Sequence, residues 1–157
     1  MTDAGQGLTG VFAPNDRLGR LEAIDLGLHE GPEDVARGPD GFLYAGSHGS
    51  IVLRISPTDG SVSNFARVGG RPLGMEFDSD GFLLVANAYL GLRRVTPDGE
   101  VDLLLSEIDE QPLIYADDVA VAADGTVYFS EASTKFGAEA AQGTLVAWNP
   151  AARFPRC

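Results

Sequence analysis

Adjacent acidic side chains occur twice just before a run of apolar residues. Glu33 and Asp34 precede VAR, and Asp117 and Asp118 precede VAVA. In both places a D-G pair and a second apolar run follow. Carboxylates in such a place are either solvated turn residues or ligands directed at a shared centre. The choice between these interpretations depends on the elements that carry them.

The chain repeats itself around three D-G pairs, Asp40-Gly41, Asp80-Gly81 and Asp124-Gly125, which lie 40 and then 44 residues apart. Each unit begins with a short apolar run, turns at the D-G pair into a second run, and continues through a polar loop to a third. In the first two units a P-T-D-G or P-D-G turn leads to a fourth run. Because glycine accepts a positive φ and proline presets φ, these pairs predict turns between strands.

Four short strands in about 40 residues are typical of one blade of a β-propeller. A β-sandwich also has short strands and Gly/Pro turns, but the fixed place of the D-G turn favours the propeller. We therefore predict an all-β fold with three four-stranded blades, in a single half-propeller domain that spans 1–157. The predicted blades cover approximately 31–68, 71–107 and 115–157.

The number of predicted strands is uneven at the two ends of this array. Residues 20–27 (RLEAIDLG) alternate like a strand but have no blade of their own, and only a proline-containing tail follows the third strand of the last unit. Three blades do not close a ring, whereas two copies would supply six. We predict a homodimer that forms a six-bladed ring, in which 20–27 of each chain completes the third blade of the other. Exchanged strands also remove open sheet edges.

The composition argues against several classes of partner. The 157 residues carry a formal net charge of −12, with one Lys against ten Arg, so we expect no nucleic acid as partner. The acidic surface disfavours anionic membranes, and no apolar run has the length of a membrane-spanning helix. The N-terminus lacks the pattern of a signal peptide, and the single Cys157 allows no internal disulfide. We therefore expect a cytoplasmic protein.

Several segments resemble the strictosidine synthase-like family, namely GPEDVA, RPLGMEFD, ANAYLGL, YADDVAVAADGTVYFSEASTKF and the opening LTGVFAPNDRL. Members of this family are six-bladed β-propellers, and the family is related to the gluconolactonase, senescence-marker and paraoxonase proteins. The resemblance covers approximately 8–146 and only the N-terminal half of a family member, whereas the tail 148–157 does not resemble the family. It implies the ring, but not how a half-ring is completed.

The resemblance also assigns a role to the acidic residues. In an antiparallel blade, the start of the first strand and the loop after the second strand lie on one face, at the mouth of the central channel. Glu33, Leu73 and Asp117 share one register, seven residues before the Asp of their D-G pair. In the gluconolactonase and paraoxonase relatives, a Glu after Gly-Pro and other oxygen ligands hold a divalent cation. The resemblance thus implies that Glu33 and Asp117 bind Ca²⁺, which takes about six to eight oxygens, or another divalent cation. The alternative is that these acids cap turns in solvent.

Other candidate residues are expected at the same mouth. His48 follows the second strand of the first blade and is a candidate base, because histidine titrates near neutral pH. An ordinary loop residue is the alternative interpretation of His48, and Asp118 is the second candidate base. The mouth-facing loops carry further residues that we expect to line a pocket, namely Asn87, Tyr89, Glu131 and Ser133.

Two classes of function remain open. The resemblance implies a lactonase- or esterase-like hydrolase, in which a channel cation polarises an ester carbonyl and His48 or Asp118 activates water. Condensation of the strictosidine synthase type is not expected, because the catalytic Glu of that family lies in the half that this chain lacks. The alternative is a non-enzymatic binding or scaffold protein, which the lack of a complete catalytic set favours.

Overall fold

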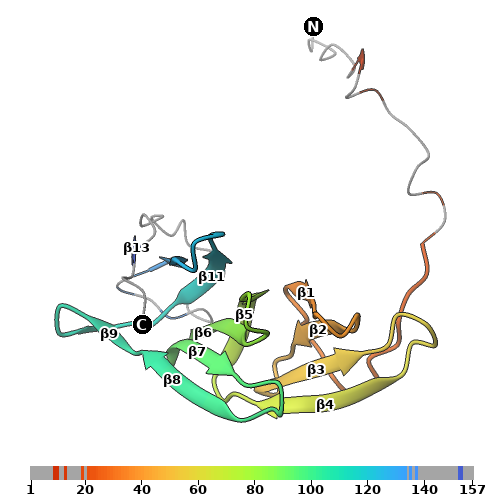
Figure 1. The fold of residues 1–157 in the computed structure, drawn as a ribbon, viewed down its shortest axis with the longest axis horizontal. Coiled ribbons are helices and arrows are strands. Elements are labelled where there is room, and N and C mark those ends of the chain that lie inside the picture. Colours follow the sequence, from red (N-terminus) through yellow and green to blue (C-terminus); the bar gives the residue numbers. More distant parts are fainter. Residues whose placement is uncertain are drawn as a thin grey trace, which may run out of the picture.

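The computed structural model describes residues 9–10, 13, 19, 21–133, 135 and 137, together with the backbone of 152–153. These residues form antiparallel β-sheets, and Figure 1 shows three of them following one another around an arc. The all-β prediction is confirmed. No helix in the described part of the chain is long and apolar enough to cross a membrane.

The sheets follow the order of the chain. The first sheet consists of β1 (Val35–Arg37), β2 (Leu43–Gly46), β3 (Ile51–Ile55) and β4 (Val62–Arg67). The second sheet repeats this order with β5 (Arg71–Phe77), β6 (Leu83–Ala88), β7 (Gly91–Val95) and β8 (Val101–Leu105). The third sheet contains β11 (Ala116–Val121), β12 (Val127–Glu131) and the backbone of β13 (Ala152–Arg153).

The D-G pairs form the turns that the sequence predicts. Gly41, Gly81 and Gly125 have φ values of 85°, 84° and 80°, in the left-handed region that residues with a side chain rarely adopt. In the first of these turns, the N–H of Gly41 donates to the carbonyl oxygen of Gly38 at 3.0 Å. Local chemistry alone therefore joins the first strand of each sheet to the second.

The core lies between the sheets. Successive residues of β6 point to opposite faces, as in any strand. Leu83 and Val85 belong to the apolar cluster shared with the first sheet, whereas Leu84 and Ala86 belong to the cluster shared with the third sheet. The second sheet is thus buried on both faces. The second sheet also positions the first strands of its two neighbours, since β1 and β11 both contact β5.

Residues 21–27, the described part of the segment 20–27 that we predicted as a strand, form no strand in the single chain. Leu26 packs against an apolar cluster of the first sheet, but the N–H of Gly27 donates to the nearby Asp25 carboxylate at 2.8 Å. A strand forms only where a neighbouring strand satisfies its backbone N–H and C=O groups. No described residue of the same chain offers such a neighbour here.

One element is not predicted by the repeat. A hairpin of β9 (Glu107–Ile108) and β10 (Gln111–Pro112) lies between β8 and β11 along the chain. Its turn places Asp109 and Glu110, which are not glycines, at φ values of 49° and 61°. The predicted third strand of the last unit, TLVAW at 144–148, lies outside the described residues.

Candidate functional site

A β-bulge presents the carboxylates of the third sheet. The pairing of β11 with β12 shifts between Ala116 and Val119, and the pairing of β5 with β6 shifts at the same place of its own repeat. The bulge in β11 contains Asp117 and Asp118. Because a bulge turns side chains out of the regular alternation of a strand, it sets the direction of these two residues.

Glu33 and Asp117 come from different sheets and lie within electrostatic reach of each other. Burial raises the pKa of the Glu33 carboxyl, and the negative charge of Asp117 raises it further. Burial, followed by the charge of Asp118, raises the pKa of Asp117. Neither Glu33 nor Asp117 receives a side-chain hydrogen bond or an ion pair from the described part of the chain. Two such carboxylates favour a bound proton or a cation.

Glu131 adds a third carboxylate to this group. Its Oε1 atom accepts hydrogen bonds from the N–H groups of Ile114 at 3.0 Å and Tyr115 at 2.8 Å. Its Oε2 atom is buried and has no hydrogen-bond partner among the described residues. Burial is the largest cause of the raised pKa of Glu131, and the charge of Asp117 adds to it. Because buried polar atoms in proteins are normally bonded, the Oε2 atom marks a place for a further partner.

Arg71 and Tyr115 belong to the same group, although the sequence alone did not single them out. The charge of Arg71 opposes the rise that burial causes in the pKa of Glu33. The Arg71 guanidinium makes no hydrogen bond or ion pair with described residues, and its Nε atom is buried. The Tyr115 ring packs against the buried Leu73. Burial, followed by the charge of Asp117, raises the pKa of the Tyr115 hydroxyl.

The register of the repeat is the signal that identifies these two residues. Arg71 lies two residues before Leu73, and Tyr115 lies two residues before Asp117. In the first unit the same place is Gly31, and the imidazole of His48 occupies the space that a Cβ at Gly31 would enter. His48 is exposed, and its imidazole lies beside this register position of the first unit. The charges that shift the pKa values of Glu33 and Asp117 come from other groups.

Asn87 is a buried positioning residue. It is 0% exposed, its Oδ1 atom accepts a hydrogen bond from the N–H of Arg71 at 3.1 Å, and its Nδ2 atom donates to the carbonyl oxygen of Gly69 at 2.9 Å. Gly69 and Gly70 both have a positive φ. Asn87 therefore fixes the turn that leads into β5 and the backbone position of Arg71.

Tyr89 and Ser133, two predicted pocket residues, differ in exposure. Tyr89 has a φ of 75°, remains 41% exposed, and its ring lies against Gly137. A bulky residue is held in this backbone region only where its surroundings fix it. Ser133 is buried, and its hydroxyl accepts a hydrogen bond from the N–H of Lys135 at 3.2 Å.

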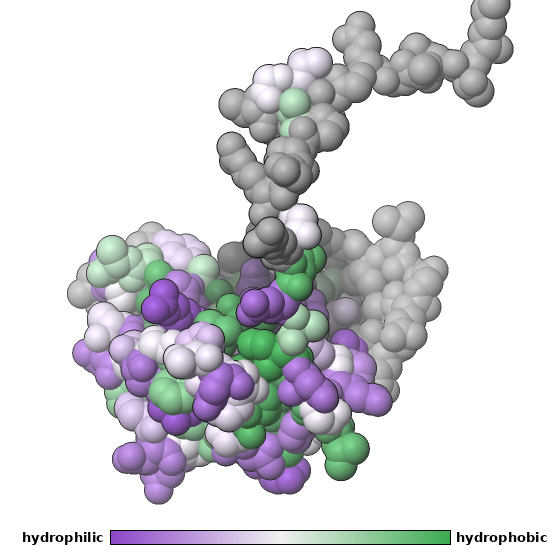
Figure 2. All heavy atoms as spheres, turned by 90° about the vertical axis from the view of Figure 1, so that its right-hand side faces the viewer, coloured by the Kyte–Doolittle hydropathy of each residue, from purple (hydrophilic) through white to green (hydrophobic). Residues whose placement is uncertain are grey.

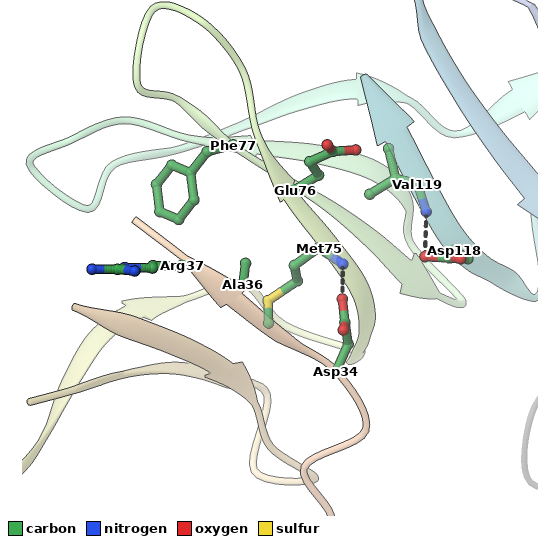
Figure 3. A pocket seen from close by; sticks show the side chains of 8 residues that line it. All are labelled: Asp34, Ala36, Arg37, Met75, Glu76, Phe77, Asp118 and Val119. Carbon is green, nitrogen blue, oxygen red and sulfur yellow. Dashed lines mark hydrogen bonds between the residues drawn. The ribbon is translucent and has the colours of Figure 1, made fainter. Parts of the chain in front are cut away.

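A cavity of about 380 Å³ lies between β1, β5 and β11, and Figure 3 shows carboxylates and apolar side chains around it. The Asp34 Oδ2 atom accepts a hydrogen bond from the N–H of Met75 at 2.8 Å. The Glu76 Oε2 atom accepts one from the N–H of Val121 at 2.7 Å. Each bond runs from a side chain of one sheet to the backbone of the next, so these carboxylates join sheets.

The carboxylates of the described residues do not form a complete metal site. No three His, Cys, Asp or Glu side chains in this part of the chain lie close enough together to hold one ion. A site at Glu33 and Asp117 would therefore need further ligands.

Replacing Asp117 by Asn should stabilise the fold at neutral pH. The folded-state pKa of Asp117 lies above its ordinary value of 3.8, so the folded state holds the proton more firmly than the unfolded state. Stability therefore falls as the pH rises from about 3.8 through the folded pKa, and the full cost is present at pH 7. Urea unfolding between pH 4 and pH 7 should show a flatter dependence for Asp117→Asn than for the wild type.

The exposed Asp98→Asn variant is the control for the loss of one negative charge, and its stability at pH 7 should stay within about 0.5 kcal/mol of the wild type. If Asp117→Asn lowers the stability at pH 7, the carboxylate has a favourable partner and the assigned cost is wrong.

Comparison with known proteins identifies the family to which this chain is related. Residues 10–55 match the family described as "Strictosidine synthase-like, N-terminal". Protein strictosidine synthase-like 6 of Arabidopsis thaliana is 39% identical over 129 residues, which is 78% of this chain. The chain belongs to the strictosidine synthase-like family. A further relative, the adipocyte plasma membrane-associated protein of Gallus gallus, is 35% identical over 147 residues, or 82% of the chain.

This strictosidine synthase-like chain covers only part of its relatives. It spans 35% of the length of the Arabidopsis protein and 35% of the length of the Gallus protein. The activities and partners of the whole relatives therefore do not pass to it directly.

Solved structures place the strictosidine synthase-like chain among β-propellers. A gluconolactonase from Xanthomonas campestris superposes with a TM-score of 0.63 at 21% identity, over 78% of this chain and 43% of that protein. Virginiamycin B lyase from Staphylococcus aureus superposes with a TM-score of 0.54 at 18% identity, over 64% of this chain and 34% of the lyase. At these identities the likeness concerns the fold alone.

Proposed function

We propose that the chain contributes one side of the site of a lactonase- or esterase-like hydrolase, at the mouth where Glu33 and Asp117 meet. The observation that carries the proposal is the pair itself. Two carboxylates from different sheets lie within electrostatic reach, and both have a raised pKa and no bonded partner in the described residues. A gluconolactonase has the same kind of fold, which is consistent with this class of reaction.

The donor atoms fit a hard divalent cation such as Ca²⁺, which binds carboxylate oxygens. Glu33 and Asp117 would hold the cation, whereas Glu131, whose buried Oε2 atom is unbonded among the described residues, does not complete a group of three ligands with them. When bound, such a cation polarises the carbonyl of an ester or lactone. The described residues hold no group of three His, Cys, Asp or Glu side chains for one ion, so the further oxygen ligands would be carbonyl groups, water or residues outside the described part of the chain.

The other side chains of the site have roles that follow from their chemistry. The guanidinium of Arg71 is free to bind a carboxylate through two parallel hydrogen bonds, and a carboxylate is the product of lactone hydrolysis. His48 and Asp118 are both exposed, so each is a candidate for the base that takes a proton from water.

The proposal predicts that lactone turnover depends on both calcium and Glu33. Turnover of a panel of lactones and esters should vanish with a chelator and return with Ca²⁺. In Glu33→Gln it should fall by more than the roughly 10–100-fold that loss of a supporting group at a metal site costs. The exposed Glu107→Gln in the β9–β10 hairpin is the matched control and should keep full activity.

A second measurement does not depend on turnover. Ca²⁺ at 100 times its dissociation constant should stabilise the wild type by about 2.7 kcal/mol, and Glu33→Gln should lose this effect. Turnover that survives both the chelator and Glu33→Gln would show that the cation mechanism is wrong.

A non-enzymatic binding or scaffold protein is the second candidate function. The observation in its favour is that the described residues lack a complete set of metal ligands. It predicts neither turnover of the panel nor a change of melting temperature with Ca²⁺, so the same two measurements separate the two functions.

A further inference from the structure

The first and third sheets each have a face against which no described sheet packs. The second sheet lies between them (Figure 1) and packs on both. Along β2 and β3, Tyr44 and Val52 face the second sheet, whereas their neighbours Ala45 and Leu53 belong to a separate cluster on the opposite face. Figure 2 views the molecule from the side of the first sheet and shows apolar residues gathered in the middle of that face.

The segment 21–28 lies along this outer face of the first sheet. Leu26 packs against the Ala45 and Leu53 cluster, and the Ile24 Cγ2 atom is 3.9 Å from where a Cβ of Gly60 would stand. Leu21 and Leu28 remain 78% and 100% exposed. The backbone of the segment makes no strand-to-strand hydrogen bond with described residues. It is thus positioned like an outer strand, but it lacks the sheet to which it would belong.

The third sheet shows the complementary deficit. The first two sheets have four strands each, whereas the third has three in the described part of the chain. No strand of the described residues occupies the edge at which a fourth strand would pair with this sheet.

The hydrogen bond from Met75 to Asp34 joins the first two sheets, and Asp118 of the third sheet is the residue that corresponds to Asp34. Asp34 caps the N–H of its neighbour Val35 with Oδ1, and its Oδ2 atom accepts the N–H of Met75 in the next sheet. Asp118 stands at the same register and caps its own neighbour Val119 in the same way. No described group bonds the Oδ2 atom of Asp118, and the residue is exposed.

We infer that the outer face of the first sheet is an interface with the third sheet of a second copy of this chain. Segment 21–28 of each copy forms the fourth strand of the partner's third sheet, and Asp118 directs its free oxygen at the first strand of the partner's first sheet. Segment 21–28, which pairs with no described strand of its own chain, then pairs with the partner's third sheet, which has three described strands. The assembly also brings a second Glu33 and Asp117 to the mouth. In this assembly both carboxylate oxygens of Asp118 accept a hydrogen bond, so His48 remains as the candidate base of the proposed hydrolase. The inference itself does not depend on any activity of the site.

The test is the molar mass of the whole chain in solution, measured by size-exclusion chromatography with light scattering. The wild type should have twice the monomer mass of 16.5 kDa. The double variant Glu22→Pro/Ala23→Pro removes the N–H groups of two adjacent residues. Only alternate residues of an antiparallel strand donate to a given neighbouring strand, so one of these two N–H groups must belong to the inferred pairing. The dimer dissociation constant of the variant should rise about tenfold or more, as expected for lost backbone hydrogen bonds.

The matched control also introduces two prolines. Ser79→Pro/Ala123→Pro places them just before the Asp of two D-G pairs, where the first unit already has Pro39, and it should stay dimeric. Circular dichroism should show both variants folded, because Glu22 and Ala23 are exposed and their backbones bond no described residue of the same chain.

Hydrogen exchange of the wild type tests the inference without any substitution. The amides of 22–27 should exchange at least tenfold more slowly in the dimer than in the diluted protein, since a protected strand exchanges through opening. A wild type that stays monomeric would overturn the inference. So would a dimer that is insensitive to Glu22→Pro/Ala23→Pro and leaves 22–27 unprotected. Neither result bears on lactone turnover or calcium binding.

Discussion

Replacing Gly74 by alanine should lower the stability of the fold by about 1–3 kcal/mol, the usual cost of overpacking a core. A Cβ at this position would stand 2.6 Å from the Cα of Asp118 and 2.9 Å from the carbonyl oxygen of Asp117. Both are backbone atoms, so no side-chain rotation relieves the overlap. The second and third sheets would have to separate, and Asp117 would move with them.

The control for Gly74→Ala is Gly49→Ala. Neither glycine has a positive φ, so neither substitution strains the backbone. A Cβ at Gly49 would meet only the Ser47 Oγ atom, at an ordinary 3.7 Å. For a chain of this size, about 1 kcal/mol shifts the melting temperature by roughly 2–4 °C, which thermal unfolding resolves. Equal melting temperatures for the two variants would contradict the close approach of the sheets.

Replacing Asn87 by alanine should cost about 2–4 kcal/mol, because a half-buried backbone donor and a half-buried backbone acceptor lose their partner at once. The Gly69 carbonyl and the Arg71 N–H are the groups left unbonded. The side chain of Asn87 is 0% exposed, so water does not readily replace it. The turn into β5 would loosen, and Arg71 would lose its fixed position beside Glu33 in the candidate site.

Asn64→Ala is the matched control, because Asn64 is exposed on β4 and its side chain makes no hydrogen bond with described residues. Its stability should stay within about 0.5 kcal/mol of the wild type. Urea unfolding of both variants checks the difference. A loss of less than about 1 kcal/mol for Asn87→Ala would mean that the two backbone groups find other partners.

The part of the fold that the sequence predicts well is the part that local chemistry decides. The D-G turns form where glycine alone accepts the required φ, as at Gly41, and the alternating apolar runs between them become strands. The family resemblance, which rests on short motifs near these turns, is confirmed by the match at residues 10–55.

The parts that the sequence does not predict depend on contacts between distant segments. Arg71 and Tyr115 join the candidate site only because β5 and β11 lie side by side. Asn87 is of a residue type that often lines pockets, but its side-chain amide bonds a turn that lies 16–18 residues earlier in the chain. The strand predicted at 20–27 has the right pattern, yet a pattern does not supply the neighbouring strand that completes it.

The bonds between sheets determine how the array is held together. Asp34 reaches the backbone of Met75, and Glu76 reaches the backbone of Val121, so each junction is closed by one carboxylate. In arrays of repeated units, stability is approximately the sum of the units and their nearest-neighbour interfaces. The central sheet takes part in two such interfaces and each outer sheet in one. Cooperativity in this chain therefore belongs to pairs of sheets, and the middle sheet couples the unfolding of both ends.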